Sequence, residues 1–319
     1  MLKKIFVSFF CCLAVFFANN VNAGYIFGNV GIGKDPIAEG TVIIMDSVNA
    51  EIIQEVNLIN QGYYESETLP DGVYRVYVES REIINGFISE GEPHYDFCSA
   101  QEYTVTGNNA VEVSASFRAS VPTVILLLDG TISGRIIDSI TEKGLANIKV
   151  MFLDVRTGLS RDQPTYTDSN GYFSWIFKRL PYSPELKVRF VDEEGVYLPK
   201  FAGGGDSDDF CMGAIYNIEK DPKILETMKT PADAIEDLIA AVNNIVMPVN
   251  AANSLIAKLE KAENFLIDKN PNNDNAACGQ LKGFLGQLNG MVNSDKITQA
   301  EADVLLKAVA ALQDSLGCS

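Results

Sequence analysis

The chain has 319 residues, a formal net charge of −17 and a single histidine, His94. Such an acidic chain repels phosphate backbones, which argues against nucleic-acid binding. One histidine nearly excludes histidine-based metal centres and catalytic triads. Hydrophobic residues make up 47% of the sequence, so the chain can bury cores and is expected to fold.

Residues 1–23 have the pattern of a secretion signal. Lys3 and Lys4 precede an apolar stretch at 5–17, and Val21-Asn22-Ala23 places small residues before a cleavage site. The stretch is shorter than the roughly 20 residues that a membrane-spanning helix needs, although such an anchor is the alternative interpretation. We expect cleavage after Ala23 and a secreted chain, either extracellular, periplasmic or on the cell surface. Removing 23 of the 319 residues, two of them lysines and none acidic, leaves 296 residues with a charge of −19.

Four cysteines remain in the mature chain, and their number bears on the redox environment. An even number of cysteines in an exported chain argues for disulfides, and four allow three connectivities. No pair has the C-x-x-C spacing of a zinc or redox site. These cysteines are Cys98, Cys211, Cys278 and Cys318.

Residues 24–128 and 129–221 repeat one plan of short strands. Alternation at 73–78 (Val-Tyr-Arg-Val-Tyr-Val) places side chains on opposite faces of a strand, and turn residues such as Asn170-Gly171 separate the strands. The pattern predicts two tandem antiparallel β-sandwich modules. The expected strands are 25–28, 40–45 and 73–78 in the first copy and 131–136, 147–153 and 186–191 in the second.

This motif series resembles the carboxypeptidase regulatory-like (transthyretin-like) family, which is related to the Cna-B modules of bacterial surface proteins. The second copy has Tyr-Ser-Pro-Glu at 182–185 in place of the family's final Gly-Tyr pair, and the first lacks the Thr-Asp pair before Gly62. The resemblance implies a β-sandwich fold and says almost nothing about the ligand. Its motifs are Gly134, 144–150, 167–173 and 180–181 in the second copy, and 69–74 in the first.

Both copies end in the same tripeptide, Asp-Phe-Cys, at 96–98 and 209–211. The two equivalent cysteines either bond to each other across the module interface or stay as small buried thiols. The oxidising environment that an exported chain enters favours the Cys98–Cys211 bond.

Residues 222–319 are expected to form a helical domain. Thr230, Pro231 and Asp233 form a helix start, and Thr298 with Glu301 forms a capping box. Apolar residues recur at helical spacing on three further segments, which predicts a bundle. They are Leu255, Leu259, Ala262, Phe265 and Leu266, then Leu281, Phe284, Leu285, Leu288 and Met291, then Leu305, Leu306, Val309, Leu312 and Leu316.

Antiparallel neighbours in such a bundle bring the start of one helix close to the end of the next. Cys278 lies near the start of the third helix and Cys318 just past the fourth, so we expect a Cys278–Cys318 bond. The domain resembles the FIMAH module of secreted bacterial proteins, which implies an extracellular accessory role. The residues that carry this resemblance are 254–262, 277–285, 296–298 and 302–306.

Two acidic segments are candidate calcium sites. Asp206, Asp208 and Asp209 follow three glycines and supply the oxygen ligands that Ca²⁺ prefers, although a solvated acidic loop is the plainer interpretation. Residues 268–274 alternate like the start of an EF-hand loop, but Gly279 stands where the loop's final glutamate belongs. A plain interhelical turn is favoured there. No cofactor is expected, unless calcium binds at one of these segments.

Other groupings are weaker. Trp175 and Tyr64 are candidates for an aromatic surface that binds glycans. His94 lies four residues before Cys98 without an orienting acid, which argues against a Cys-His nucleophile. Lys149 is a candidate for an internal isopeptide bond of the Cna-B type, but no acidic partner appears on the 171–175 strand.

Because no catalytic constellation appears, we expect a protein that is not an enzyme. The leading hypothesis is a secreted or cell-surface binding or structural protein, in an adhesion or scaffold role, with a protein or glycan ligand. The alternative is a carbohydrate-binding accessory of a secreted polysaccharide-degrading system. A hydrolase with an unrecognised site is the third hypothesis.

Overall fold

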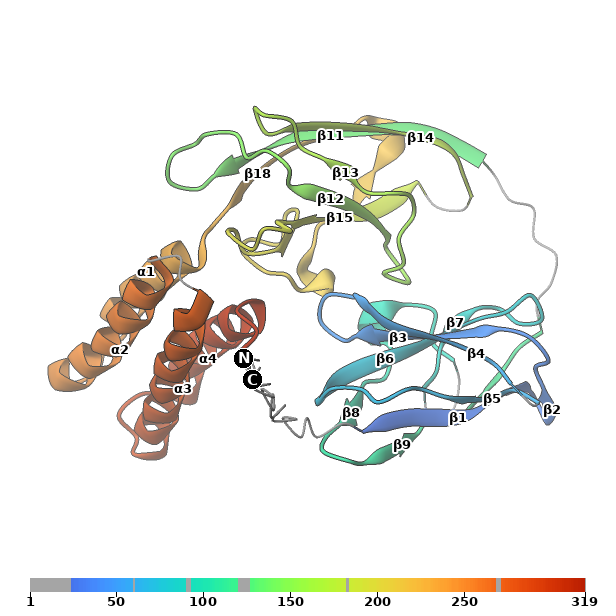
Figure 1. The fold of residues 1–319 in the computed structure, drawn as a ribbon, viewed down its shortest axis with the longest axis horizontal. Coiled ribbons are helices and arrows are strands. Elements are labelled where there is room, and N and C mark those ends of the chain that lie inside the picture. The colour runs from blue at the N-terminus through green and yellow to red at the C-terminus, as the bar shows by residue number, and fades with distance from the viewer. Residues whose placement is uncertain are drawn as a thin grey trace, which may run out of the picture.

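The computed structural model describes residues 24–59, 61–89, 93–119, 127–181, 184–267 and 271–318. Within these ranges the chain forms sandwich-like β-sheets followed by four C-terminal α-helices (Figure 1). The predicted fold class, all-β modules followed by a helical bundle, is confirmed. The predicted signal at residues 1–23 lies outside the described residues.

The first module packs two sheets around one core. Apolar residues that alternate along the strands, such as Val42, Ile44 and Val76, fill that core together with Ile26 and Tyr64. The outer sheet contains β1 (Tyr25–Ile32), β2 (Asp35–Pro36), β5 (Tyr63–Glu65), β9 (Ala110–Glu112) and β10 (Ala115–Phe117). The inner sheet contains β4 (Ile52–Asn57), β3 (Thr41–Asp46), β6 (Gly72–Glu79), β7 (Gly86–Phe87) and β8 (Tyr103–Val105).

The second module repeats this arrangement. Its core contains Val150, Phe152 and Val188 from the inner sheet and Ile132 and Phe177 from the outer sheet. The inner sheet contains β13 (Thr165–Tyr166), β12 (Lys149–Asp154), β15 (Glu185–Val191), β16 (Lys200–Phe201) and β17 (Tyr216–Asn217). The outer sheet contains β14 (Tyr172–Pro181), β11 (Leu127–Asp138) and β18 (Lys223–Met228).

Two features of the modules differ from the prediction. The sandwiches are not purely antiparallel, because β1 pairs in parallel with β9 and β10, and β11 pairs in parallel with β18. The first strand of each module therefore lies beside its last. The second module also runs on past residue 221, since Ile224 and Met228 of β18 are buried in its core. These two residues are four positions apart, which the sequence alone does not distinguish from helical spacing.

One glycine in each module explains part of the shared motif. Gly171 has a φ of +80° and its counterpart Gly62 a φ of +78°. A Cβ at Gly171 would lie 2.2 Å from the backbone oxygen of Ile136, and one at Gly62 would lie 2.1 Å from that of Val30. Both positions therefore require glycine for two reasons, the left-handed backbone and the close strand.

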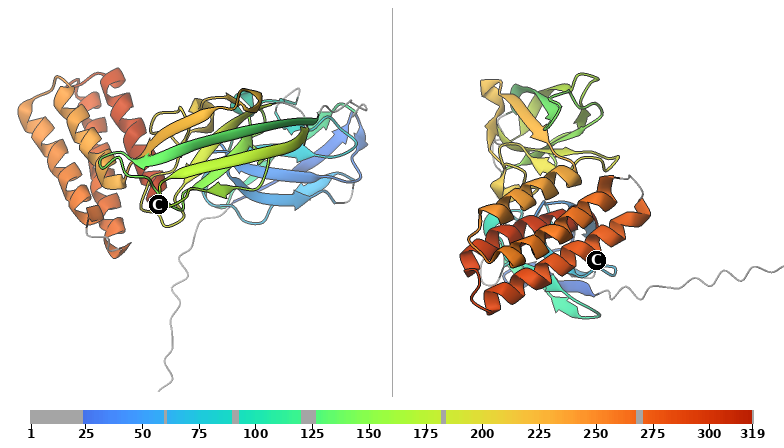
Figure 2. Two further views of the ribbon diagram at one scale, coloured as in Figure 1. Left: turned by 90° about the horizontal axis from the view of Figure 1, so that it is seen from above. Right: turned by 90° about the vertical axis from the view of Figure 1, so that its left-hand side faces the viewer.

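The first helix begins at Pro231, as the helix start at Thr230 and Pro231 predicted, while residues 223–228 of the predicted helical domain form β18. Thr230 and Asp233 form a capping box there, and Thr298 and Glu301 form another before the last helix. Figure 2 shows the helices running side by side at one end of the molecule. They are α1 (Pro231–Asn244), α2 (Val249–Ile267), α3 (Pro271–Asn293) and α4 (Gln299–Ser315).

The start of α3 changes the interpretation of the EF-hand-like segment. Asn272 and Asp274 belong to the helix, so their alternation does not describe a loop, while residues 268–270 lie outside the described ones. Cys278 on α3 is bonded to Cys318 beyond α4, with 5.4 Å between their Cα atoms. Of the helices that the structure describes, none combines the length and the hydropathy needed to cross a bilayer.

The four β-sheets stack in four layers, with the two inner sheets facing each other (Figure 1). Along β3, Val42 and Ile44 face the core of the first module, while Ile43 and Met45 face the second module. Leu153 of β12 meets them from the other side. The central strands of the inner sheets, β3, β6 and β15, are thus buried on both faces, which gives near-continuous buried runs.

Candidate functional site

A third hydrophobic cluster joins the two modules, and we call it the joint. Phe97 and Phe210 lie at its centre with ring centroids 5.0 Å apart, edge to face, and Phe87 and Phe201 flank them. Its buried members are Ile43, Met45, Ala50, Tyr77, Phe87, Phe97, Ala100, Leu153, Phe201 and Phe210.

The contacts across the joint are reciprocal. The amide of Phe97 donates to the carbonyl of Arg156 at 2.5 Å, and the amide of Phe210 donates to the carbonyl of Val48 at 2.8 Å. Arg156 and Val48 occupy the same place in their modules, two residues after Asp154 and Asp46. Each of these aspartates accepts a hydrogen bond from the amide two residues on. The two modules therefore meet through equivalent surfaces.

A buried cation supports each central phenylalanine from its own module. The Arg75 guanidinium lies 4.4 Å from the ring centroid of Phe97, and the Lys187 ammonium lies 4.5 Å from that of Phe210. Lys187 also donates to the carbonyl of Phe210 at 2.6 Å, and Arg75 donates to that of Ala100 at 3.3 Å. Burial lowers the pKa of both cations, so the joint holds charge against a desolvation cost.

A disulfide closes the joint at its surface. The structure bonds Cys98 to Cys211, with 5.7 Å between the Cα atoms, and both residues are exposed. Each cysteine follows a central phenylalanine in a short 3₁₀ helix, η1 (Phe97–Ser99) or η2 (Phe210–Met212). In this bond Cys98 has no free thiol that could act as a nucleophile beside His94.

The three aspartates considered for calcium are held by other partners. Asp208 accepts two hydrogen bonds from Arg189, at 2.7 and 2.6 Å, and Asp206 pairs with Lys229 at 2.7 Å. Asp209 accepts from the amide of Cys211 and caps η2. Across the described part of the chain, no group of three or more such side chains is arranged to hold a metal ion. The calcium site at this loop stays a prediction, and in this structure the three carboxylates accept hydrogen bonds or pair with cations of the protein itself.

The aromatic surface expected for glycans is not formed by the residues named for it. Tyr64 is fully buried and its hydroxyl donates to the carbonyl of Val113 at 2.6 Å. Its neighbours Tyr63 and Glu65 face outward. The hypothesis therefore placed Tyr64 on the wrong face of this strand. Trp175 is half-buried, its ring stacks on Phe152, and its Nε1 donates to Asp162 at 3.1 Å.

Lys149 does not support an isopeptide bond. Its Nζ lies 2.8 Å from the Glu193 carboxylate in an ion pair.

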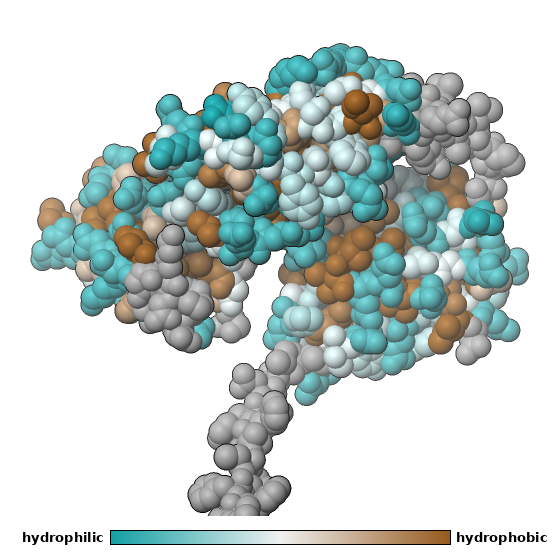
Figure 3. Space-filling model, turned by 45° about the horizontal axis from the view of Figure 1, so that its top comes forward, coloured by the Kyte–Doolittle hydropathy of each residue, from teal (hydrophilic) through white to brown (hydrophobic). Residues whose placement is uncertain are grey.

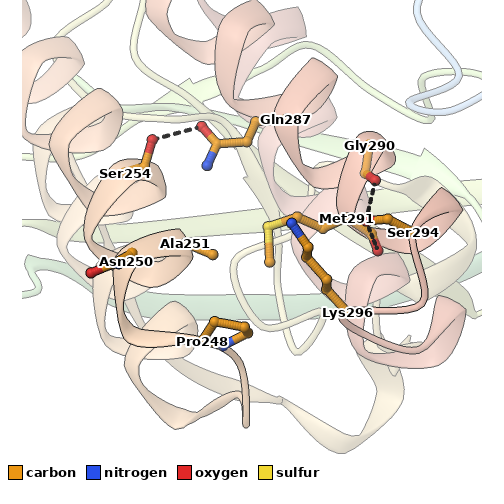
Figure 4. Close-up of a pocket in the computed structure, with 9 residues that line it drawn as sticks. All are labelled: Pro248, Asn250, Ala251, Ser254, Gln287, Gly290, Met291, Ser294 and Lys296. Atoms are coloured by element: carbon orange, nitrogen blue, oxygen red, sulfur yellow. Dashed lines mark hydrogen bonds between the residues drawn. The ribbon is translucent and has the colours of Figure 1, made fainter.

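A separate hollow of about 480 Å³ lies between the start of α2 and the end of α3 (Figure 4). There the Ser254 hydroxyl donates to Gln287 at 3.1 Å, and the amide oxygen of Gln287 also accepts from Lys258 at 2.6 Å. Ser254, Lys258 and Gln287 are thus hydrogen-bonded to one another.

Sequence reasoning named the cysteines of the joint but missed the residues beside them. The signal was present, because Asp-Phe-Cys recurs in both copies and its phenylalanine is as equivalent as its cysteine. A second signal was the unbroken apolar run at 42–45 (Val-Ile-Ile-Met), which lacks the alternation of a strand with one solvated face. The carbonyls of Val48 and Arg156 carried no signal, since backbone acceptors are common to all residues.

No family model matches the chain, and no curated protein matches it, so the two family resemblances are expectations only. Among solved structures, the Bacillus anthracis TIE protein is similar at 13% identity and a TM-score of 0.23, covering 66% of this chain and 34% of that one. A streptococcal ancillary pilin gives 12% identity, a TM-score of 0.23, and 66% and 62% coverage. BcpA, the major pilin subunit of Bacillus cereus, gives 9%, 0.23, and 65% and 99%. This chain thus spans a third of the TIE protein and under two thirds of the ancillary pilin.

Proposed function

We propose that this chain is an exported, non-catalytic structural or adhesive protein of the cell surface, in which the two β-modules act as one rigid body. The joint is the observation that supports this proposal. A shared core, reciprocal hydrogen bonds and a disulfide connect the modules. Modules that act independently on a flexible linker do not need such contacts with each other.

The disulfide favours an oxidising compartment. A bond between cysteines 113 residues apart stabilises the chain by about 5 kcal/mol in the chain-entropy model. Cytosolic reductants would keep both cysteines reduced and remove that contribution. Export by the signal at residues 1–23 fits this requirement.

The test is to fractionate cells that produce the full chain and to analyse the protein by intact mass. We expect a surface or medium fraction, a mature chain that begins at Gly24, and no free thiols until a reductant is added. A cytosolic protein that retains residues 1–23 and has all six of its cysteines as free thiols would overturn the proposal. So would any substrate turnover that a single substitution such as Asp208→Asn abolishes.

A further inference from the structure

A large cleft lies between the two β-modules and the helical bundle. Its volume is about 1310 Å³, larger than the roughly 300–1,000 Å³ of typical small-molecule pockets. Figure 3 shows the hollow between the bundle and the first module. Its size suits a segment of polypeptide chain better than a metabolite.

The walls of the cleft are apolar and carry small side chains. On the bundle side, α1 and α4 present Ala234, Ala241, Ala308 and Ala311, which leave room above the helix surfaces. On the opposite side Val48 and Met212 are 49% and 62% exposed. Apolar side chains this exposed are expected to gain from being covered. Val304, which is 68% exposed on α4, extends the same surface.

The polar rim carries an excess of negative charge. Arg189 is shared between Asp208 and Glu51, and Lys229 is shared between Asp206 and Asp237. The two further carboxylates of the lining, on Asp46 and Asp209, accept hydrogen bonds from backbone amides. The lining thus holds six carboxylates, Asp46, Glu51, Asp206, Asp208, Asp209 and Asp237, and four cations, Arg189, Lys200, Lys229 and Lys307.

We propose that this cleft binds a segment of a partner protein that carries lysine or arginine side chains beside apolar ones. The apolar side chains of the segment would cover the alanine walls, and its cations would approach carboxylates that now share a cation in pairs. Opposite charge at the rim also favours faster association with such a segment. The proposal rests on the proposed function, because it names the kind of partner that the surface protein holds.

The probe is a fluorescein-labelled 12-residue peptide of alternating lysine and leucine, titrated with the oxidised mature protein and followed by anisotropy. We expect binding that weakens at least fivefold between 50 and 200 mM salt, as charge screening requires, and no binding of the matching glutamate–leucine peptide. Asp237→Asn should weaken binding several-fold. Glu236→Gln makes the same charge change on α1 outside the cleft and should leave the affinity unchanged.

A steric variant tests the location. Ala308→Trp fills the cleft and should lower the affinity at least tenfold, whereas Ala240→Trp places the same ring on an exposed part of α1 away from the cleft and should not. Circular dichroism checks that both variants are folded. Equal affinities for the two variants, or equal binding of both peptides, would overturn the proposal. A dimer in sedimentation that Ala308→Trp dissociates would overturn it too, since the occupant would then be a second copy. None of these results depends on cell fractionation, so the proposed function is tested separately.

Discussion

Gly286 lies on the exposed face of α3, and a Cβ there would meet no heavy atom within 4 Å. Glycine costs a helix interior about 1 kcal/mol relative to alanine. We therefore expect Gly286→Ala to raise the free energy of unfolding of the bundle by about 0.5–1 kcal/mol in urea denaturation. Gly144→Ala is the opposite case, because its Cβ would lie 1.9 Å from the backbone oxygen of Asn170. The free energy of unfolding of that variant should be lower by about 1–3 kcal/mol.

The capping box of α4 makes the bundle sensitive to acid. Hydrogen bonds from Thr298 hold the pKa of Glu301 below its ordinary value of 4.5. A carboxylate with a lowered folded-state pKa contributes stability above its unfolded pKa and loses it as the pH falls through the folded pKa. Urea unfolding followed between pH 7 and pH 2.5 should show this loss beginning near pH 4.5. Glu301→Gln should flatten that part of the profile, and an unchanged profile would contradict the role of the cap.

At the scale of single elements, the joint depends on Phe210. This side chain is fully buried between Phe97 and Phe201. We expect Phe210→Ala to cost about 3–5 kcal/mol, because it removes apolar contact and leaves a cavity. Hydrogen exchange of the Phe97 amide, which bonds Arg156 across the joint, should quicken in the same variant. Ile176→Ala, at a position 62% exposed on β14, is the control and should cost less than about 1 kcal/mol.

Sequence reasoning succeeded where a pattern is local. The caps at Thr230 and Thr298 and the apolar stripes of the helices depend on neighbours within four residues, and the structure has them as expected. It failed where the answer depends on distant partners. The strand at 223–228 is defined by its pairing with β11. The inward orientation of Tyr64 was missed because a shift of one residue in the assumed strand register exchanges the buried and exposed faces. No sequence signal named Arg189 and Lys229 as the partners of Asp208 and Asp206, because only the tertiary structure brings these residues together.

At the scale of the whole molecule, the disulfides determine which residues carry a pulling force applied between the termini. A load between the termini bypasses the residues between Cys98 and Cys211 while their bond is intact. The sequence separation is 113 residues, which corresponds to roughly 380 Å of extended chain at about 3.4 Å per residue. Single-molecule extension should therefore gain that length when the two exposed cysteines are reduced. Cys278→Ser isolates this gain from that of the second disulfide, and an unchanged contour length would contradict the bypass.

The reciprocal pairing of the modules also limits how the chain can be extended. Each module contributes the same patch, so the contact is isologous and is saturated by two partners. A third module of this kind would find no complementary face left, in contrast to head-to-tail arrays that lengthen indefinitely. A further module of this kind would therefore have to contact this pair through a different surface.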